Sequence, residues 1–235
     1  MKIIKVKSYE ELSRIAADMI EKQIEDKANS VLGLATGSTP LGTYANLVED
    51  YKNGKVSFSQ ISTINLDEYC GLSGDNKESY RYFMNSNLFD KIDIDKSKTH
   101  VPNGEADMDE ETQTYEKLCE SLGFADLQLL GIGNNGHIGF NEPSESFAAV
   151  THKVKLAEST IKANSRLFDR VEDVPRYAIT MGIGTIMKAK KVLLIAGEGK
   201  AEIVEKAIFG EVVPSVPASV LQLHSDVTVI YIPKN

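Results

Sequence analysis

The residues from Gly131 to Pro143 concentrate the groups that could carry out chemistry. This stretch, GIGNNGHIGFNEP, holds four glycines, three asparagines, one histidine and one glutamate within thirteen residues. An imidazole such as His137 can take up and return protons near neutral pH, and a carboxylate such as Glu142 can orient it. Glycines let the backbone approach a bound molecule closely. The stretch therefore predicts an acid–base centre; the alternative is a glycine-rich turn whose histidine faces solvent.

Two adjacent acids, Asp67 and Glu68, follow the apolar run of residues 61–66. Open α/β sheets place their sites at the carboxyl ends of strands, and a carboxylate located there could act as a general base. The alternative is a solvated turn without a function.

A loop rich in glycine and hydroxyl groups, residues 35–40 (ATGSTP), separates an apolar run from an expected helix. Unpaired N–H groups at the start of a helix bind anions, and hydroxyl groups add donors. We therefore expect Gly37, Ser38 and Thr39 to bind a phosphate. The loop lacks the lysine of a Walker A motif and the spacing of GxGxxG, so a nucleotide is not indicated. The alternative is that Ser38 or Thr39 only caps the helix.

Lys200 stands at the expected start of another helix, in the sequence GEGK. The N-terminal end of a helix carries positive charge, so a cation is unfavourable there. A lysine at this place therefore suggests an anion held between the ammonium group and the backbone. The alternative is an ordinary surface lysine.

Alternating strands and helices must position these groups. Apolar runs predict strands at residues 3–6, 31–34, 61–66, 127–132, 151–156, 177–181, 191–196 and 227–232. Helical patterns lie at about residues 9–24, 41–51, 78–88, 108–122, 158–168 and 200–209, with a short helix within 214–223. Ser8 and Glu11 read as a capping box for the first helix, while residues 89–103 read as irregular.

This alternation predicts a single domain over residues 1–235 with a three-layer α/β fold. The sheet is expected to be open, twisted and mainly parallel, with helices on both faces, as in Rossmann-like proteins. The loops at residues 35–39, 67–69 and 133–142 would then be neighbours on one edge of the sheet, bringing phosphate site, base and histidine together.

Composition excludes several classes of protein. The 235 residues carry a net charge of -8, which argues against nucleic-acid or anionic-membrane partners but not against a small anion held by local donors. Cys70 and Cys119 form neither a CxxC pair nor a disulfide framework, which favours a reducing cytoplasm. We expect no signal peptide and no membrane span. His137 has no partners at metal-ligand spacing, so we expect no metal site.

The chain resembles the glucosamine-6-phosphate deaminases nearly from end to end. The resemblance is carried by LGLATGSTPLGTY (32–44), NLDEY (65–69), GIGNNGHIGFNEP (131–143), ANSRLF (163–168) and GEGKA (197–201). It implies that D-glucosamine 6-phosphate and water give D-fructose 6-phosphate and ammonia, by aldose–ketose isomerisation and deamination without an organic cofactor.

The resemblance also implies a role for each site residue. His137 would open the sugar ring while Glu142 orients it, and Asp67 would move a proton between C-2 and C-1, with Glu68 in support. The phosphate would be held by Gly37, Ser38, Thr39, Arg166 and Lys200.

The chain departs from the longer, allosteric members of this family at two places. Those members have an aspartate two residues before the histidine, where this chain has Asn135. Asparagine can form hydrogen bonds but carries no charge, so an imidazolium would be less favoured. The basic patch expected after NEP is also missing from residues 144–156, and the sequence stops soon after the last strand. We therefore expect no activation by N-acetylglucosamine 6-phosphate, and a monomer or small homo-oligomer.

The two alternative functions are a 6-phosphogluconolactonase and a sugar-phosphate sensor. A 6-phosphogluconolactonase needs no proton abstraction from carbon, so Asp67 would lose its role. A non-catalytic sugar-phosphate sensor would require a DNA-binding helical module before the first strand. The LDEY and NEP stretches and the acidic charge favour the deaminase over both.

Overall fold

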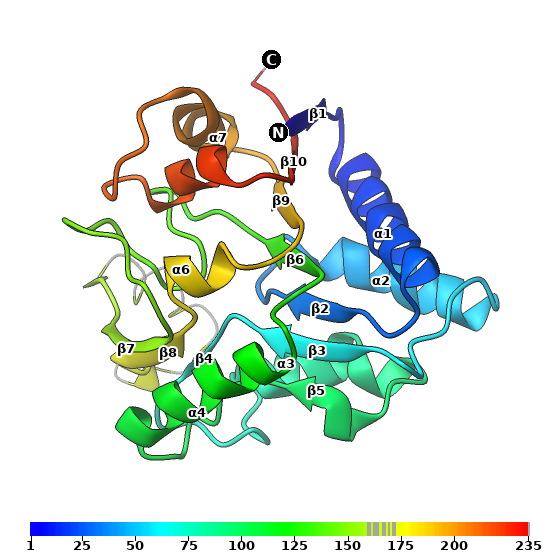
Figure 1. Cartoon of the computed structure of the whole chain (residues 1–235), viewed down its shortest axis with the longest axis horizontal. Coiled ribbons are helices and arrows are strands. Elements are labelled where there is room, and N and C mark those ends of the chain that lie inside the picture. Colours follow the sequence, from blue (N-terminus) through cyan, green and yellow to red (C-terminus); the bar gives the residue numbers. More distant parts are fainter. Residues whose placement is uncertain (159–160, 162–164, 166–167, 169, 171–172, 235) are drawn as a thin grey trace.

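A seven-stranded sheet forms the centre of the computed structural model, which describes residues 1–158, 161, 165, 168, 170 and 173–234. The strands run in the order β1-β10-β9-β6-β2-β3-β5, and every neighbouring pair is parallel (Figure 1). They are β1 (Lys2–Lys5), β2 (Val31–Leu34), β3 (Ser62–Asn65), β5 (Thr99–His100), β6 (Leu127–Leu130), β9 (Val192–Ala196) and β10 (Val227–Tyr231).

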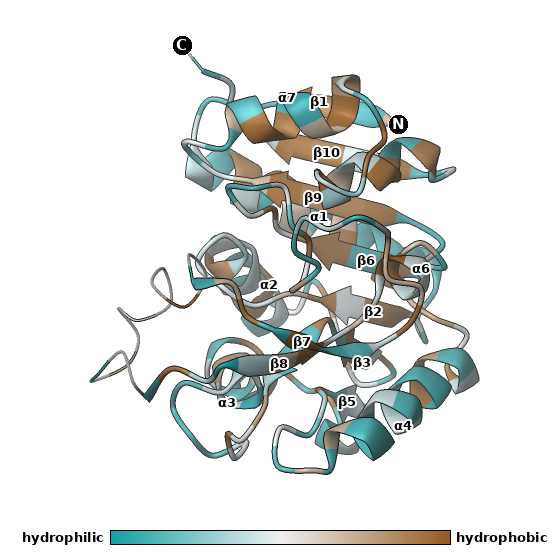
Figure 2. Cartoon of the chain, turned by 90° about the vertical axis from the view of Figure 1, so that its left-hand side faces the viewer, coloured by the Kyte–Doolittle hydropathy of each residue, from teal (hydrophilic) through white to brown (hydrophobic). Residues whose placement is uncertain are grey.

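Helices cover both faces of this sheet. One face packs against α1 (Tyr9–Asp26), α2 (Leu41–Lys52) and α3 (Tyr80–Asn87). The other packs against α4 (Met108–Ser121), α6 (Ile183–Ile186), α7 (Ala201–Phe209) and the 3₁₀ helix η5 (Pro217–Leu223). Strands buried on both faces must be apolar throughout, and Figure 2 shows β9 and β10 as strongly hydrophobic. The predicted three-layer fold is confirmed.

A second, three-stranded sheet was not predicted. It has the order β4-β8-β7 and is antiparallel, with β4 (Asp67–Tyr69), β8 (Tyr177–Thr180) and β7 (His152–Lys155). Figure 1 shows β7 and β8 to one side of the main sheet. The prediction that residues 67–69 form a loop is therefore wrong. The strands predicted near residues 151–156 and 177–181 exist, but they pair with each other, and β8 also pairs with β4.

Leu66 is the residue at which the chain passes from one sheet to the other. Its N–H donates to the carbonyl of Leu34 in β2 over 3.2 Å, and its own carbonyl accepts from the N–H of Met181 over 2.7 Å. Continuous pairing therefore carries β3 into β4 without an exposed turn. As a result, Asp67 is the first residue of β4, a buried strand of the second sheet that starts next to the carboxyl end of β3 in the first sheet.

The helix predictions are largely confirmed, although the short helix α6 was not predicted and two other segments differ. Residues 89–103, predicted to be irregular, contain the 3₁₀ helices η1 (Phe89–Lys91) and η2 (Lys96–Lys98) and the edge strand β5. The helix predicted at 158–168 falls largely on residues outside the described part of the chain. In that described part, no helix combines the length and hydrophobicity required to cross a bilayer.

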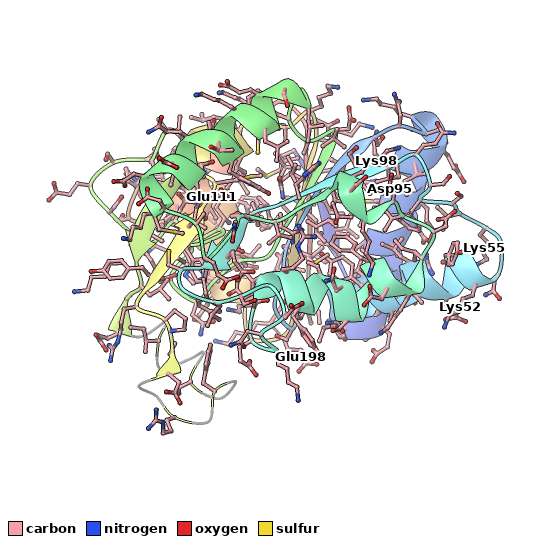
Figure 3. The ribbon with its side chains drawn as sticks, turned by 90° about the horizontal axis from the view of Figure 1, so that it is seen from below. Lys52, Lys55, Asp95, Lys98, Glu111 and Glu198 are labelled. Carbon is pink, nitrogen blue, oxygen red and sulfur yellow. The ribbon has the colours of Figure 1, made fainter. Side chains whose placement is uncertain are left out.

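The order of the strands creates a crevice between β2 and β6. From β2 the chain runs through α2 to β3 on one side, and it later returns through α4 to β6 on the other side. Because α2 packs on one face of the sheet while Ile132 and Ile138, which follow β6, pack on the other, the loops that leave β2 and β6 diverge, and a ligand can bind between them. Lys52 and Lys55 mark the far, C-terminal end of α2 in Figure 3, away from this crevice.

Glu116 of α4 links the second sheet to the body of the protein. The residue is 8% exposed, and its carboxylate accepts hydrogen bonds from the N–H of Thr151 over 2.9 Å and from the hydroxyl of Thr151 over 2.6 Å. The hydroxyl of Thr185 in α6 adds a third bond over 2.8 Å. One buried carboxylate thus fixes the start of β7 and helix α6 on α4.

We predict that Glu116→Gln lowers the free energy of unfolding by about 1–3 kcal/mol, because the amide cannot accept all of these bonds and brings donors into a site built of donors. Urea denaturation measures the change. Glu120→Gln is the matched control: this exposed residue on the same helix lies 3.7 Å from Lys188, and its loss should cost less than about 1 kcal/mol. Equal effects of the two substitutions would contradict the linking role of Glu116.

Candidate active site

A cavity of about 490 Å³ opens at the crevice between β2 and β6. Its wall comes from five parts of the chain: the loop after β2, the junction of β3 and β4, the start of α3, the loop after β6, and the segment before α7. The predicted site residues that line it are Gly37, Ser38, Thr39, Asp67, Asn135, His137 and Lys200. The fold thus brings together residues that are far apart in the sequence.

The loop after β2 presents unpaired backbone donors. Among the described residues, none accepts a hydrogen bond from the backbone N–H groups of residues 36–39. Gly37 has φ of +101°, a conformation that side chains disfavour and that glycine adopts freely. Helix α2 begins after Pro40, which makes no side-chain cap. The alternative that Ser38 or Thr39 only caps this helix is therefore wrong.

Asp67 presents a carboxylate to the cavity without a compensating partner. The residue is 6% exposed, and within the described chain no donor forms a hydrogen bond with its carboxylate. Burial, with a smaller contribution from the neighbouring charge of Glu68, raises the pKa of Asp67 from 3.8 to about 8. A carboxyl group with such a pKa can exchange a proton near neutral pH.

Glu68 behaves differently from its neighbour. It is 1% exposed, and its carboxylate accepts the backbone N–H groups of Tyr69 (2.8 Å), Tyr80 (2.9 Å) and Arg81 (2.9 Å). Burial raises the pKa of Glu68, while these backbone hydrogen bonds oppose the increase. Two of the bonds come from the first turn of α3, so Glu68 anchors that helix rather than facing the cavity.

His137 is held by its own loop. Its backbone N–H donates to Asn135 Oδ1 over 3.2 Å, and Asn135 Nδ2 donates to Glu142 Oε2 over 2.6 Å. The same Glu142 oxygen lies 3.5 Å from His137 Nδ1. The imidazole also lies against Gly133, where any Cβ would overlap the ring. Glu142 itself lies behind the histidine, outside the wall of the cavity.

Lys200 directly precedes α7, and it lines the cavity. Its ammonium group donates to Asn134 Oδ1 over 2.5 Å, and burial lowers its pKa. A partly desolvated ammonium group beside unpaired N–H donors favours an anionic ligand. The other predicted phosphate-binding cation, Arg166, lies outside the described residues.

Sequence reasoning missed an aromatic wall. Tyr80 and Phe140 both line the cavity, with ring centroids 5.9 Å apart and planes at 8°. Tyr69 packs against Tyr80 with a centroid distance of 4.9 Å. Tyr80 sits in a helix and Phe140 in a glycine-rich loop, so neither pattern indicated that the two would meet. Asn134 was also missed, although it adjoins Asn135.

The described residues contain no group of three or more His, Cys, Asp or Glu side chains that could hold a metal ion.

Comparisons with known proteins agree on one family. Residues 5–230 match the family described as glucosamine-6-phosphate isomerases/6-phosphogluconolactonase. A glucosamine-6-phosphate deaminase from Lachnoclostridium phytofermentans is 60% identical over 232 residues, covering 98% of each chain. One from Clostridium perfringens is 53% identical over 232 residues, covering 98% of this chain and 96% of its own.

Solved structures point the same way. A monomeric glucosamine-6-phosphate deaminase superposes with a TM-score of 0.96 at 50% identity, covering 99% of this chain and 97% of its own. A 6-phosphogluconolactonase from Trypanosoma brucei reaches a TM-score of 0.78 at 20% identity, covering 98% and 95%, which shows a shared fold alone.

We predict that Asp67→Asn makes the protein more stable at alkaline pH. Because the folded state raises the pKa of Asp67, the carboxyl group favours folding fully below its ordinary pKa of 3.8, and this contribution is lost as the pH rises through about 8. The amide of the variant does not titrate, so it loses no stability as the pH rises. Between about pH 5 and about pH 9 the variant should gain about 2 kcal/mol or more relative to the wild type.

Urea denaturation at several pH values measures this difference. Asp75→Asn, at an exposed aspartate in the loop before α3, serves as the control and should show no such trend. A difference between wild type and Asp67→Asn that stays constant with pH would show that the carboxyl group titrates normally.

Proposed function

Because the chain belongs to the family of glucosamine-6-phosphate isomerases and 6-phosphogluconolactonases, we propose that it is a glucosamine-6-phosphate deaminase. It converts D-glucosamine 6-phosphate and water into D-fructose 6-phosphate and ammonia, and acts in amino-sugar catabolism. The observation that carries this choice is the buried carboxylate of Asp67 in the same cavity as His137 and the loop of residues 36–39. A lactonase would have no use for a base placed to act at carbon.

The phosphate of the substrate binds at the loop after β2. In the described part of the chain, no acceptor pairs with the backbone N–H groups of Gly37, Ser38 and Thr39, so they can donate to it, and the adjacent hydroxyl groups add donors. Lys200 exchanges its contact with Asn134 for the phosphate, which compensates the ammonium group for its burial. Arg166 supplies a second cation. These local donors allow a protein of net charge -8 to hold a dianion.

Ring opening is the first chemical step. The imidazole of His137 takes the proton of the anomeric hydroxyl and returns one to the ring oxygen, which gives the open aldehyde. Glu142 and Asn135 fix the loop that carries the ring. Since Asn135 is uncharged, Glu142 is the carboxylate that stabilises charge on the imidazole.

Proton transfer at carbon follows ring opening, because the C-2 proton is acidic only beside a carbonyl group. Asp67 removes this proton to give an enolamine and then delivers a proton to C-1. The product is a ketose imine, which water hydrolyses to fructose 6-phosphate and ammonia. A pKa raised to about 8 makes Asp67 a stronger base than an ordinary carboxylate, which suits this step.

The proposed reaction also defines the enzyme class, and other features bear on the cell compartment and the oligomeric state. Deamination by water makes it a hydrolase that acts on an amino-sugar phosphate. Both cysteines are free, which supports a reducing cytoplasm. Its similarity to a monomeric deaminase supports a monomer or a small assembly.

The function is tested by measuring ammonia and fructose 6-phosphate released from glucosamine 6-phosphate. We expect both products from the wild type, and a loss of about 10²- to 10⁴-fold in kcat for Asp67→Asn, as for removal of a general base. Asp75→Asn should retain full activity. Hydrolysis of 6-phosphogluconolactone without ammonia release would assign the lactonase function instead, and saturable binding without either reaction would favour a sensor.

A further inference from the structure

Tyr9, at the start of α1, contacts the loop after β2 from behind. Its hydroxyl oxygen lies 3.0 Å from the carbonyl oxygens of both Ser38 and Thr39, so its single proton is shared between them. The same oxygen accepts the backbone N–H of Gly42 over 2.8 Å. One phenol thus joins the end of this loop to the first turn of α2.

The position of Tyr9 is fixed by local structure. Ser8 is the N-cap of α1 and accepts the N–H of Glu11 over 3.2 Å, which confirms half of the predicted capping box. The Glu11 carboxylate accepts the N–H of Lys7 over 2.8 Å instead of that of Ser8. Tyr9 is therefore the first residue of a well-capped helix, and its side chain points toward α2.

Close packing of α1 on α2 brings the phenol within reach. Gly42 has no room for a Cβ, which would overlap Ser13 Oγ and lie 3.0 Å from Tyr9 Cε1. The two helices can approach this closely only because residue 42 is glycine. The contact between the helices and the hydrogen bonds of Tyr9 therefore depend on the same short stretch of α2.

A second tyrosine holds the other end of the loop. Tyr44 of α2 is fully buried; its hydroxyl donates to the carbonyl of Ala35 over 2.6 Å and accepts the Ala35 N–H over 3.3 Å. Residues 36–39 lie between these two anchors. Because a trans peptide is planar, the Ser38 carbonyl that Tyr9 engages on the side of α1 fixes the Thr39 N–H in the opposite direction. The Thr39 carbonyl, which Tyr9 also engages, belongs to the peptide bond with Pro40, which has no N–H.

We infer that Tyr9 is a positioning residue for phosphate binding: it holds the end of the loop of residues 36–39 with the carbonyl groups of Ser38 and Thr39 turned away from the bound phosphate. A flip of the Ser38–Thr39 peptide would present its carbonyl oxygen to a dianion and remove the Thr39 N–H as a donor. The inference deepens the proposed function and rests on its assignment of the phosphate to this loop. Tyr9 itself is not part of the cavity wall.

Tyr9→Phe tests this inference because it removes the hydroxyl and keeps the ring. We expect the KM for glucosamine 6-phosphate to rise about threefold to tenfold, the range that corresponds to one lost hydrogen bond, while kcat stays nearly unchanged. The dissociation constant of inorganic phosphate, measured by calorimetry, should rise by the same factor.

Two control variants separate positioning from packing. Ser13→Ala alters the same contact between α1 and α2, but removes no hydrogen bond to the loop. Tyr82→Phe removes the hydroxyl group of an exposed tyrosine in α3 that is not part of the cavity wall. Both should retain wild-type KM and phosphate affinity, even where urea denaturation shows a change in stability.

The outcomes are distinguishable. Unchanged phosphate affinity in Tyr9→Phe, or an equal rise in KM for Ser13→Ala, would overturn the positioning role, as would a wild type that binds no phosphate. If the wild type binds phosphate but releases no ammonia from glucosamine 6-phosphate, the proposed function fails. A weaker phosphate affinity of Tyr9→Phe would even then support the inference.

Discussion

The burial of Asp67 is the constraint on which the rest of the site depends. Removing a carboxylate from water without supplying donors is unfavourable, and the resulting rise in pKa is what makes the group a useful base. The passage of the chain through Leu66 into a second sheet imposes this burial, because it places Asp67 inside β4 rather than on an exposed turn. The fold thus creates the reactivity of the residue.

The polar groups around Asp67 are divided between holding the structure and meeting the substrate. Glu68 is committed to three backbone donors and anchors α3, which carries Tyr80 into the cavity wall. Glu142 and Asn135 are committed to the loop of His137. Within the described residues, the N–H donors of residues 36–39 and the carboxylate of Asp67 make no hydrogen bond, and the imidazole of His137 lines the same cavity. Each of these has a place in binding, ring opening or proton transfer.

Sequence patterns predicted the layers of the fold and most of the cavity wall, because buried parallel strands and glycine-rich loops leave clear local signals. They failed where pairing is decided at a distance. Nothing local distinguishes Asp67–Tyr69 as a strand, because its partner β8 lies far along the chain. The different surroundings of Asp67 and Glu68, and the reach of Tyr9 to the loop of residues 36–39, likewise arise from packing between distant elements.

The most direct measurement of the central claim is the exchange of the C-2 proton of glucosamine 6-phosphate in D₂O, followed by NMR together with interconversion of the sugar anomers. The account predicts that Asp67→Asn still accelerates anomer interconversion, since His137 opens the ring, but no longer exchanges the C-2 proton. His137→Gln should lose the acceleration of anomer interconversion. Exchange at C-2 that continues at the wild-type rate in Asp67→Asn would contradict the account, because another base would then have to act at carbon.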